Sequence, residues 1–452
     1  MNNIPWLANN RFPAMLSSAA AYLEALAATP PPPYRERLPP AQRAVGRLLE
    51  CVGHPERGLP IVHIAGSKGK GSVALMVESI LRAAGLRVGT YLSPHLQDWR
   101  ERFRLAGQAV TEECLVVALA GLRPYVQAWE AENSVAAGFF DVATAAALWL
   151  FQQARVEVAV IEAGLGGRLD ATNVVSPRVS CITSVELEHT DKLGADLTAI
   201  AREKAGIIKP GAPLVMGALP VAAAREVSAR AQALDVPLWR WGSDIRTAIV
   251  SEEAAGLTVI CEVGDGRYDV FLPVLGAHQA HNAALAIACV RALGVIPDAT
   301  LGAAVQQGFA RLRLPGRCEI LSREPYLVVD SAHTLDSAAV LRKALEQLQA
   351  RRVHWVLSFA RDKNVGGLGA AFVAPGDILT LTQADARRSL APEVIAAALR
   401  AQRPPIDACI VREPGAALRA AYQGLAAADL LCVSGSVYMA GWGRTVFGAH
   451  PE

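Results

Sequence analysis

The stretch IVHIAGSKGKGS, residues 61–72, decides the fold of this chain. Its first five residues, 61–65, form a short apolar run that is typical of a buried parallel strand. A glycine-rich turn follows, and helical periodicity then continues from residue 72 to residue 84, just before Gly85. Strand, glycine turn and helix in this order predict a cradle for phosphate. The glycines let backbone N–H groups point inward, and the N-terminus of a helix attracts an anion.

Two side chains of this glycine loop (residues 66–72) have an expected task. Lys70 is placed to reach the β- and γ-phosphates of a nucleotide, and the Ser72 hydroxyl is placed to ligate Mg²⁺. The alternative interpretation, a glycine-rich turn with solvated lysines, fits the strand–loop–helix context less well. Gly71 separates the lysine from the serine, which departs from the general Walker A spacing. The residues predicted to bind ATP here are Gly66, Ser67, Lys68, Gly69, Lys70, Gly71 and Ser72.

Strands and helices alternate on the C-terminal side of the loop, which predicts an α/β fold with right-handed crossovers. A helix over residues 15–28 and four prolines at 30–33 precede the loop. Further strands are predicted at 88–92, 156–162 and 179–184, with helices at 142–153 and 197–207. Three short antiparallel strands at 247–251, 257–263 and 268–272 and a helix at 282–293 follow.

A boundary near residues 311–316 divides the chain into domains spanning 1–311 and 312–452. After the boundary, strands are predicted at 326–330, 355–358, 377–381 and 430–434, with helices at 337–349 and 392–401. The chain of 452 residues is long enough for two cores. A second, smaller α/β domain of the Rossmann-like kind is therefore expected.

Composition excludes several classes of protein. Hydrophobic residues make up 52% of the chain and charged residues 19%, which indicates a packed globule and not a disordered chain. A net charge of +2 gives no reason to expect a nucleic-acid partner. The eight cysteines are scattered without a C-x-x-C pair, so we expect reduced thiols. Neither a signal peptide nor a membrane-spanning run is evident, and we expect the cytoplasm.

Further motifs follow the glycine loop in a fixed order over most of the chain. They are YLSPHL (91–96), EAGLGGRLDATN (162–173), EHT (188–190), EKAGIIK (203–209), HQ and NAA (278–284), PGR (315–317), DSAH (330–333), DK (362–363) and SGS (434–436). With them, the chain resembles the folylpolyglutamate synthase and dihydrofolate synthase family, a branch of the Mur ligase superfamily. The resemblance implies an N-terminal P-loop ATPase domain of the Mur ligase type and a C-terminal ligase domain.

The resemblance also implies a reaction. An enzyme of this family activates a carboxylate with ATP as an acyl phosphate and joins it to the amine of an amino acid. The implied substrates are dihydropteroate or a tetrahydrofolate and L-glutamate, and the implied cations are Mg²⁺ and also K⁺. A monomer without nucleic-acid or membrane partners is expected. The alternatives are a Mur-type ligase for another acid or amino acid, a P-loop kinase or switch, and a non-catalytic nucleotide-binding module.

The implied metal ligands are Ser72, Ser93, Glu162 and His189. Without the resemblance, a lone Glu or His after a strand is more often a cap or a satisfied polar residue. Lys204 would by itself be interpreted as a solvated charge. The resemblance implies instead that CO₂ carbamylates Lys204 and that the resulting anion holds a second Mg²⁺. The implied catalytic residues are Lys70, Lys204 and His333.

The implied ATP contacts outside the loop are Asn282 at the adenine end, Arg317 at the phosphates and Asp330 at the ribose. His333 is assigned to the incoming amino acid or to the interdomain site. The pterin-side substrate is expected to contact six residues, among which Phe140 offers a ring for stacking, with a core phenylalanine as the equal alternative. These six are Phe139, Phe140, Asp141, Leu169, Asp170 and Ala171.

The chain departs from the family pattern at several positions. Ser67 and Lys68 stand where the family has threonine and asparagine, Asp141 stands for glutamate, and Glu188 stands for aspartate. Thr334 and Leu335 replace asparagine and proline, and Asn364 replaces an aspartate. The departures outside the glycine loop lie at the amino-acid and pterin ends and leave the ATP and metal residues intact, so the reaction type is predicted more firmly than the substrate.

Overall fold

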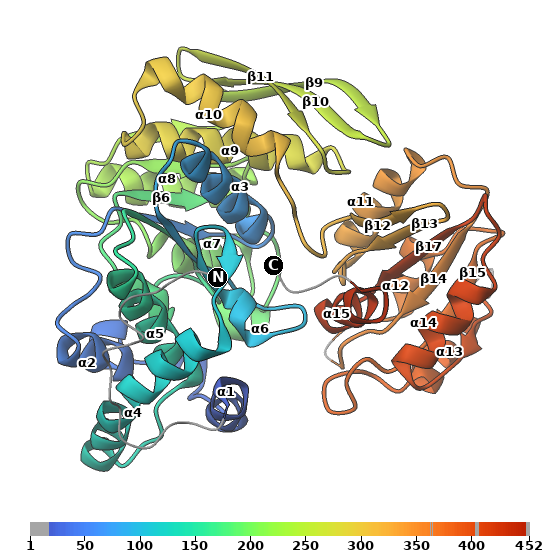
Figure 1. Ribbon diagram of the computed structural model, residues 1–452, viewed down its shortest axis with the longest axis horizontal. Helices are drawn as coiled ribbons and strands as arrows, with labels where there is room; N and C mark the ends of the chain where they lie inside the picture. The colour runs from blue at the N-terminus through green and yellow to red at the C-terminus, as the bar shows by residue number, and fades with distance from the viewer. Residues whose placement is uncertain (1–17, 362, 364, 403–405, 449–452) are drawn as a thin grey trace.

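In the part of the chain that the structure describes, the strands form three separate sheets of eight, three and six strands (Figure 1). The computed structural model describes residues 18–361, 363, 365–402 and 406–448. Elements up to α10 build the eight- and three-stranded sheets and their helices, and elements from β12 onward build the six-stranded unit beside them. The predicted α/β fold class is confirmed.

The eight-stranded sheet has the order β4-β3-β2-β5-β1-β6-β7-β8. Its strands are β1 (Ile61–Ala65), β2 (Val88–Tyr91), β3 (Phe103–Leu105), β4 (Gln108–Ala109), β5 (Val158–Glu162), β6 (Val179–Ile182), β7 (Leu214–Met216) and β8 (Leu238–Arg240). Strand β1 is central, buried at all five residues and parallel to both β5 and β6. The carboxyl ends of these three strands therefore meet at one edge, where an α/β sheet places its ligands.

Helices cover both faces of this sheet. They are α1 (Ala19–Ala28), α2 (Ala44–Cys51), α3 (Lys70–Ala83), α4 (Glu112–Asn133), α5 (Phe139–Gln153), α6 (Thr190–Leu193), α7 (Leu197–Ala205), α8 (Val221–Ala233), α9 (His278–Leu293) and α10 (Asp298–Ala310). Helix α3 packs against α9 and α10 over one face, while α2, α4 and α5 form a second core on the other face.

The three-stranded sheet is an antiparallel meander that extends the first core. It consists of β9 (Ile245–Glu253), β10 (Gly256–Val263) and β11 (Gly266–Leu272), in the order β11-β10-β9. Alternate residues of β10, among them Leu257, Val259 and Cys261, are fully buried against α9 and its neighbours. The period of two follows from the pleat, which points successive side chains to opposite faces.

The six-stranded sheet has the order β12-β13-β17-β14-β15-β16, with only β12 antiparallel to its neighbour. Its strands are β12 (Glu319–Arg323), β13 (Tyr326–Val329), β14 (Val353–Leu357), β15 (Ile378–Leu381), β16 (Cys409–Ile410) and β17 (Leu430–Ser434). The helices are α11 (Leu335–Glu346), α12 (Val365–Phe372), α13 (Pro392–Arg400), α14 (Pro414–Gln423) and α15 (Val437–Val446).

Predicted and observed elements agree best where a strand is fully buried. Residues 61–65 and 430–434 form strands with the predicted limits. Helix α3 begins two residues before the predicted start, because Gly69 at φ +82° serves as its N-cap. Helix α1 begins at Ala19, capped by the Ser18 side chain, and predicted residues 15–17 lie outside the described part of the chain. Helices α4 and α10 were not predicted.

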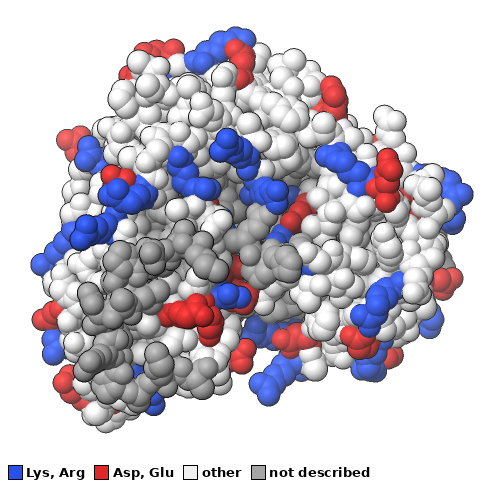
Figure 2. All heavy atoms as spheres, viewed as in Figure 1, with Lys and Arg blue, Asp and Glu red and all other residues white. Residues whose placement is uncertain are grey.

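The thiols and the charges complete the description. All eight cysteines are free, and six of them are buried. Basic and acidic side chains are interspersed on the face seen in Figure 2. Within the described ranges, every helix is too short or too polar to cross a membrane.

His63 makes the fold sensitive to acid. It lies in the middle of β1 and is fully buried, and only its Nε2 has a partner, the Thr172 hydroxyl at 2.9 Å. Burial lowers the pKa of His63 to about 3. A histidine in an unfolded chain titrates near ~6.5. Between these values the unfolded state binds more protons, so this contribution to stability is complete above the unfolded pKa and is lost as the pH falls.

We predict that His63→Gln flattens the acid dependence of the free energy of unfolding. Below the unfolded pKa, the wild type should lose up to about 1.4 kcal/mol per pH unit more than the variant. Urea unfolding of both proteins between pH 4 and 8 would measure this difference. Their difference at pH 8, where both side chains are neutral, reports packing alone. Parallel pH profiles would show that His63 does not stay neutral in the fold.

Candidate functional site

The glycine loop lies between β1 and α3 with little space around its backbone. A Cβ added to Gly66 would overlap the hydroxyl of Thr183, which follows β6. At Gly69, with φ +82°, an added Cβ would lie 2.6 Å from Oδ1 of Asn282 on α9. Asn282 is buried and donates 2.9 Å to Oε1 of Gln279. The loop and the predicted adenine contact are thus in direct contact.

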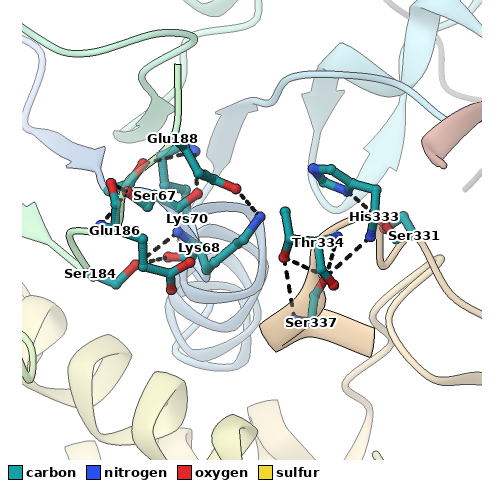
Figure 3. Close-up of polar contacts among 11 residues, drawn as sticks. Ser67, Lys68, Lys70, Ser184, Glu186, Glu188, Ser331, His333, Thr334 and Ser337 are labelled. Atoms are coloured by element: carbon teal, nitrogen blue, oxygen red, sulfur yellow. Dashed lines mark hydrogen bonds and ion pairs between the residues drawn. The ribbon is translucent and has the colours of Figure 1, made fainter. Parts of the chain in front are cut away.

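Residues 183–186, after β6, hold the loop from the side (Figure 3). The backbone N–H of Ser67 donates to Ser184 O at 2.9 Å, and that of Lys68 donates to the Ser184 hydroxyl at 2.8 Å. The Ser67 hydroxyl accepts from the backbone N–H of Glu186 at 2.9 Å. These bonds fix the course of the loop without a ligand.

Lys70 is folded over the loop from which it comes. Its Nζ donates to the carbonyl oxygens of Gly66 and Ser67, at 3.1 and 3.4 Å. It also lies 4.0 Å from Oε1 of Glu162, at the end of β5. The ammonium group is therefore near the loop interior, where an anion would meet it.

Glu162 lies at the carboxyl end of β5 in a cavity of about 70 Å³, together with Ser72, Ser93 and Arg317. Its Oε2 accepts from the backbone N–H of Ser93 at 3.0 Å. Burial raises the pKa of this carboxyl, and the nearby charge of Lys70 opposes that effect. The structure brings together three of the predicted metal ligands, Ser72, Ser93 and Glu162, with Arg317, a predicted ATP contact from outside the loop.

These donors fit a hard divalent cation. One carboxylate and two hydroxyls are oxygen ligands of the kind that Mg²⁺ prefers, with phosphate and water oxygens completing the shell. No group of three or more His, Cys, Asp or Glu side chains suited to a metal exists among the described residues.

Lys204 and His189 form a second group. Lys204 on α7 is buried, and burial, followed by the charge of Lys70, lowers its pKa to about 7, while Glu188 and Glu186 oppose this shift. His189 is the N-cap of α6, and burial lowers its pKa, with Glu188 and Lys204 among its charged neighbours. His189 does not line the Glu162 cavity. The predicted metal ligands thus divide into two neighbouring groups.

Three of the predicted residues lie in the six-stranded unit or in the segment just before it, namely Arg317, Asp330 and His333. Arg317 lines the Glu162 cavity, and its Nη1 donates to Gly316 O at 3.0 Å and to the Ser331 hydroxyl. Asp330, directly after β13, accepts from the backbone N–H groups of Cys318 and Ala332, at 2.8 and 2.6 Å. Burial raises the pKa of Asp330. Its carboxylate is held firmly in place by the backbone.

His333 follows Asp330 and is half-buried. Its Nδ1 lies 2.8 Å from Ser331 O, so Nδ1 carries the hydrogen and donates. Burial, followed by the charge of Lys68, lowers the pKa of His333 to about 4. The neutral ring therefore presents Nε2 as an acceptor.

The predicted pterin-side residues lie in the first turn of α5 and in the segment that follows β5. The Phe140 ring packs against Tyr91, with centroids 5.8 Å apart, and Phe139 meets Trp99 edge-on at 5.0 Å. Asp170 accepts from the backbone N–H of Leu165 at 2.8 Å. Asp141 is paired with a residue that the sequence did not point to, Arg43, and Leu169 and Ala171 are buried close by.

Arg43 connects two of these residues. It donates through Nε to the Asp141 carboxylate at 3.1 Å and through Nη1 to Leu169 O at 2.7 Å. Burial raises the pKa of Asp141, and Arg43 opposes that shift. Arg43 belongs to no motif and stands just before α2, so only its basic charge near a run of prolines could have drawn attention to it.

The loop after β2, which includes residues 93–98, connects the Glu162 cavity to the six-stranded unit. Gln97 accepts from Nε of Arg444 at 2.9 Å and donates to the Thr445 hydroxyl at 3.1 Å. A Cβ added to Gly441 on α15 would overlap Leu96 O. Residues 93–98 therefore touch both the Glu162 cavity and α15.

Comparison with known proteins agrees with this arrangement. Residues 104–290 match the Mur ligase middle domain, and residues 316–437 match the Mur ligase glutamate ligase domain. The chain is 34% identical over 446 residues to the dihydrofolate synthase/folylpolyglutamate synthase of Mycobacterium tuberculosis, covering 92% of each chain. The chain belongs to the folylpolyglutamate synthase/dihydrofolate synthase family of Mur ligases.

Solved structures of the family have the same fold. The ADP complex of Mycobacterium tuberculosis folylpolyglutamate synthase superposes with a TM-score of 0.86 at 33% identity, covering 96% of this chain and 99% of that one. The Yersinia pestis bifunctional enzyme, complexed with AMPPNP and a Mn ion, gives 0.82 at 30% identity, covering 96% and 99%. The chain spans about half the length of the Haloferax volcanii relative, a probable bifunctional folylpolyglutamate synthase/dihydropteroate synthase, at 34% identity and 91% coverage of this chain.

Two departures from the pattern of the folylpolyglutamate synthase/dihydrofolate synthase family meet in the structure. Lys68 forms an ion pair with Glu188, which the sequence analysis did not anticipate (Figure 3). Thr334 is the N-cap of α11, where its hydroxyl accepts from the backbone N–H of Ser337 at 3.3 Å. Asp362 and Asn364 lie outside the described residues.

We predict that Gly69→Ala weakens nucleotide binding by about tenfold, as expected for ~1.4 kcal/mol. The left-handed backbone costs about 1–2 kcal/mol of stability for a residue with a Cβ, and the methyl group must also displace Asn282. Calorimetric titration with a non-hydrolysable ATP analogue measures the binding, and thermal unfolding measures the stability.

Gly85→Ala is the matched control. Gly85 has φ +85°, but a Cβ there meets nothing within 4 Å. Both variants should lose similar stability, and only Gly69→Ala should bind the analogue more weakly. Equal affinities in the two variants would mean that the contact between Gly69 and Asn282 plays no part in nucleotide binding.

Proposed function

We propose that the chain is an ATP-dependent ligase that adds L-glutamate to dihydropteroate, to a tetrahydrofolate, or to both. The observation that carries the proposal is the shared cavity, because Ser72 of the glycine loop, Glu162 of β5 and Arg317 of the C-terminal part line one space. Relatives named dihydrofolate synthase/folylpolyglutamate synthase cover nearly the whole chain, which supports the same reaction.

The reaction has two steps. A carboxylate oxygen of the acid attacks the γ-phosphorus of ATP, the bond to the β-phosphate oxygen breaks, and an acyl phosphate and ADP result. The amine nitrogen of glutamate then attacks the acyl carbon, phosphate leaves, and the nitrogen loses a proton. Both steps gather negative charge, so cations and N–H donors must lie around the reacting groups.

We assign ATP to the interface of the two proposed domains, 1–311 and 312–452. The glycine loop would hold the phosphate tail, with Lys70 turning from its own loop carbonyls to the phosphates. Asn282 would contact the adenine end, Asp330 the ribose and Arg317 the phosphates. Arg317 suits paired phosphate oxygens because its guanidinium is a planar fork.

We assign Mg²⁺ to Glu162, Ser72 and Ser93, where bound metal would neutralise phosphate charge. His189 and, as a carbamate anion, Lys204 would hold a second cation, and K⁺ is a further candidate cation. The neutral Nε2 of His333 can accept the proton of the attacking amine, because Nδ1 already donates to Ser331 O.

The acid substrate is assigned to the region of Phe139, Phe140 and Asp141 with Leu169, Asp170 and Ala171. Arg43 adds a cation to this region and fixes the Asp141 carboxylate. Asp141 stands where the family has glutamate, so its side chain is one methylene shorter. The guanidinium of Arg43 lies close enough to form an ion pair with this shorter side chain. The eight free thiols suit a reducing compartment, and we propose a cytoplasmic monomer.

The function is tested by phosphate release from the purified chain given ATP, Mg²⁺, L-glutamate and either dihydropteroate or tetrahydrofolate. We expect release that requires both the acid and glutamate, with the amide product seen by mass spectrometry. Lys70→Ala and Glu162→Gln should each lower kcat by about 100-fold or more. A phosphorylated product without an amide would indicate a kinase, and release with a different acid or amino acid would indicate another ligase.

A separate prediction concerns Lys204. A primary amine reacts with CO₂ only when neutral, and the lowered pKa near 7 leaves much of Lys204 neutral at physiological pH. We propose that the carbamate forms, with release of one proton, and that activity rises with bicarbonate. Lys204→Ala should lose about 100-fold in kcat, while exposed Lys192→Ala should not.

Intact-mass measurement with and without bicarbonate checks the modification itself. The proposal of a carbamate fails if the mass does not change and Lys204→Ala remains fully active. Loss of activity without any mass change would leave Lys204 as a buried cation near the phosphates and would also exclude the carbamate.

A further inference from the structure

Two residues that depart from the family pattern, Lys68 and Glu188, form one ion pair, although they are 120 residues apart in the chain. Lys68 replaces an asparagine in the glycine loop, and Glu188 replaces an aspartate. The lysine adds a charge that the pattern lacks, and the glutamate adds the methylene that extends a carboxylate toward it. Their side chains are 30% and 19% exposed, so the pair is partly accessible, and Thr334 and His333 face it (Figure 3).

The backbone of Lys68 determines where its ammonium group points. Its N–H donates to the Ser184 hydroxyl at 2.8 Å, and its carbonyl oxygen accepts from the hydroxyls of Ser184 and Thr183. The side chain leaves the loop on the side of the six-stranded unit, toward Glu188 and facing Thr334 and His333 (Figure 3). Lys70, in contrast, covers the loop carbonyls. The ammonium groups of the two lysines therefore point to different places, that of Lys70 over the loop and that of Lys68 away from it.

The space that Lys68 faces has complementary chemistry. His333 is close enough that the charge of Lys68 disfavours its protonation, and its Nε2 is left as an acceptor. An acceptor and a cation on opposite sides of a gap suit a molecule that carries an amine and a carboxylate. Thr334 is not a candidate for this contact, because its hydroxyl is used in capping α11.

We infer that Lys68 binds a carboxylate of the incoming amino acid and that Glu188 is the positioning residue that holds Lys68 in place. The inference rests on the proposed function, since it names a specificity-determining residue of the same site. A partly exposed ion pair is worth little, so a substrate carboxylate can share or replace Glu188 at low cost. The chain thereby gains a charged contact where an asparagine would offer a neutral amide.

The test compares Lys68→Asn, which restores the residue of the family pattern, with Lys343→Asn, which removes an exposed lysine of α11. In steady-state phosphate release, Lys68→Asn should raise KM for L-glutamate about tenfold, as expected for loss of a charge-assisted hydrogen bond. KM for ATP should change less than about twofold, because the substitution keeps the loop backbone that would hold the phosphates, and Lys343→Asn should behave as the wild type. Glu188→Gln should raise KM for glutamate by a smaller factor.

Substrate analogues identify the carboxylate. L-glutamine lacks the γ-carboxylate and isoglutamine lacks the α-carboxylate, and the wild type should discriminate against both. Lys68→Asn should lose its discrimination against one of the two and keep the other. A merely structural effect of the substitution would lower kcat or stability and leave both discrimination ratios intact.

The outcomes separate the two proposals. Absence of glutamate-dependent phosphate release in the wild type contradicts the proposed function. An active wild type whose Lys68→Asn variant shows a raised KM for ATP, or unchanged KM for glutamate and unchanged analogue ratios, overturns the inference about Lys68. If Lys68→Asn does not fold, Glu188→Gln decides, because an unchanged KM for glutamate in that variant also overturns the inference.

Discussion

The hydrogen bonds between the glycine loop and residues 183–186 are the constraint on which the site depends. They exist because β1 and β6 are neighbours in the parallel sheet, so the segments that follow the two strands leave it side by side. A loop of small residues has little stiffness of its own. The neighbouring segment supplies it, and the same segment continues to Glu188 and His189, which brings the second group of charged residues to the loop.

Burial of like charges is the second constraint. Burial, followed by the charge of Lys70 and with a smaller effect of Lys68, lowers the pKa of Lys204, while Glu188 and Glu186 oppose this shift. Glu162 is also buried, and it lies 4.0 Å from the oppositely charged Lys70. Such an arrangement is costly without a ligand, because charged groups lose hydration when buried. A polyanion with its metal ions would relieve the repulsion among the lysines, so the unliganded fold already favours the ligand that the motifs predict.

The sequence predicted what depends on local patterns. The limits of β1 and β17 followed from continuous apolar runs, and the glycine loop followed from its flanking strand and helix. The grouping of Ser72, Ser93 and Glu162 was implied by ordered motifs. Pairs formed by tertiary contact were not predictable, such as Arg43 with Asp141, 98 residues apart, because neither residue shows in its own neighbourhood which partner it will meet. The sequence placed Thr334 among the departures from the family pattern, and only the structure shows that it is the N-cap of α11.

The segment at 93–98 has a mechanical consequence. At one end of the segment, the backbone N–H of Ser93 donates to Glu162. Near its other end, the Gln97 side chain is hydrogen-bonded to Arg444 and Thr445 of α15. A rotation of the six-stranded unit would therefore either move residues 93–98 with it or break both hydrogen bonds between Gln97 and α15. The Leu96 carbonyl of this segment also lies so close to Gly441 of α15 that a Cβ there would overlap it, so a movement of α15 toward the segment would meet its backbone. Through this segment, the position of the six-stranded unit is coupled to Glu162, at the carboxyl end of β5.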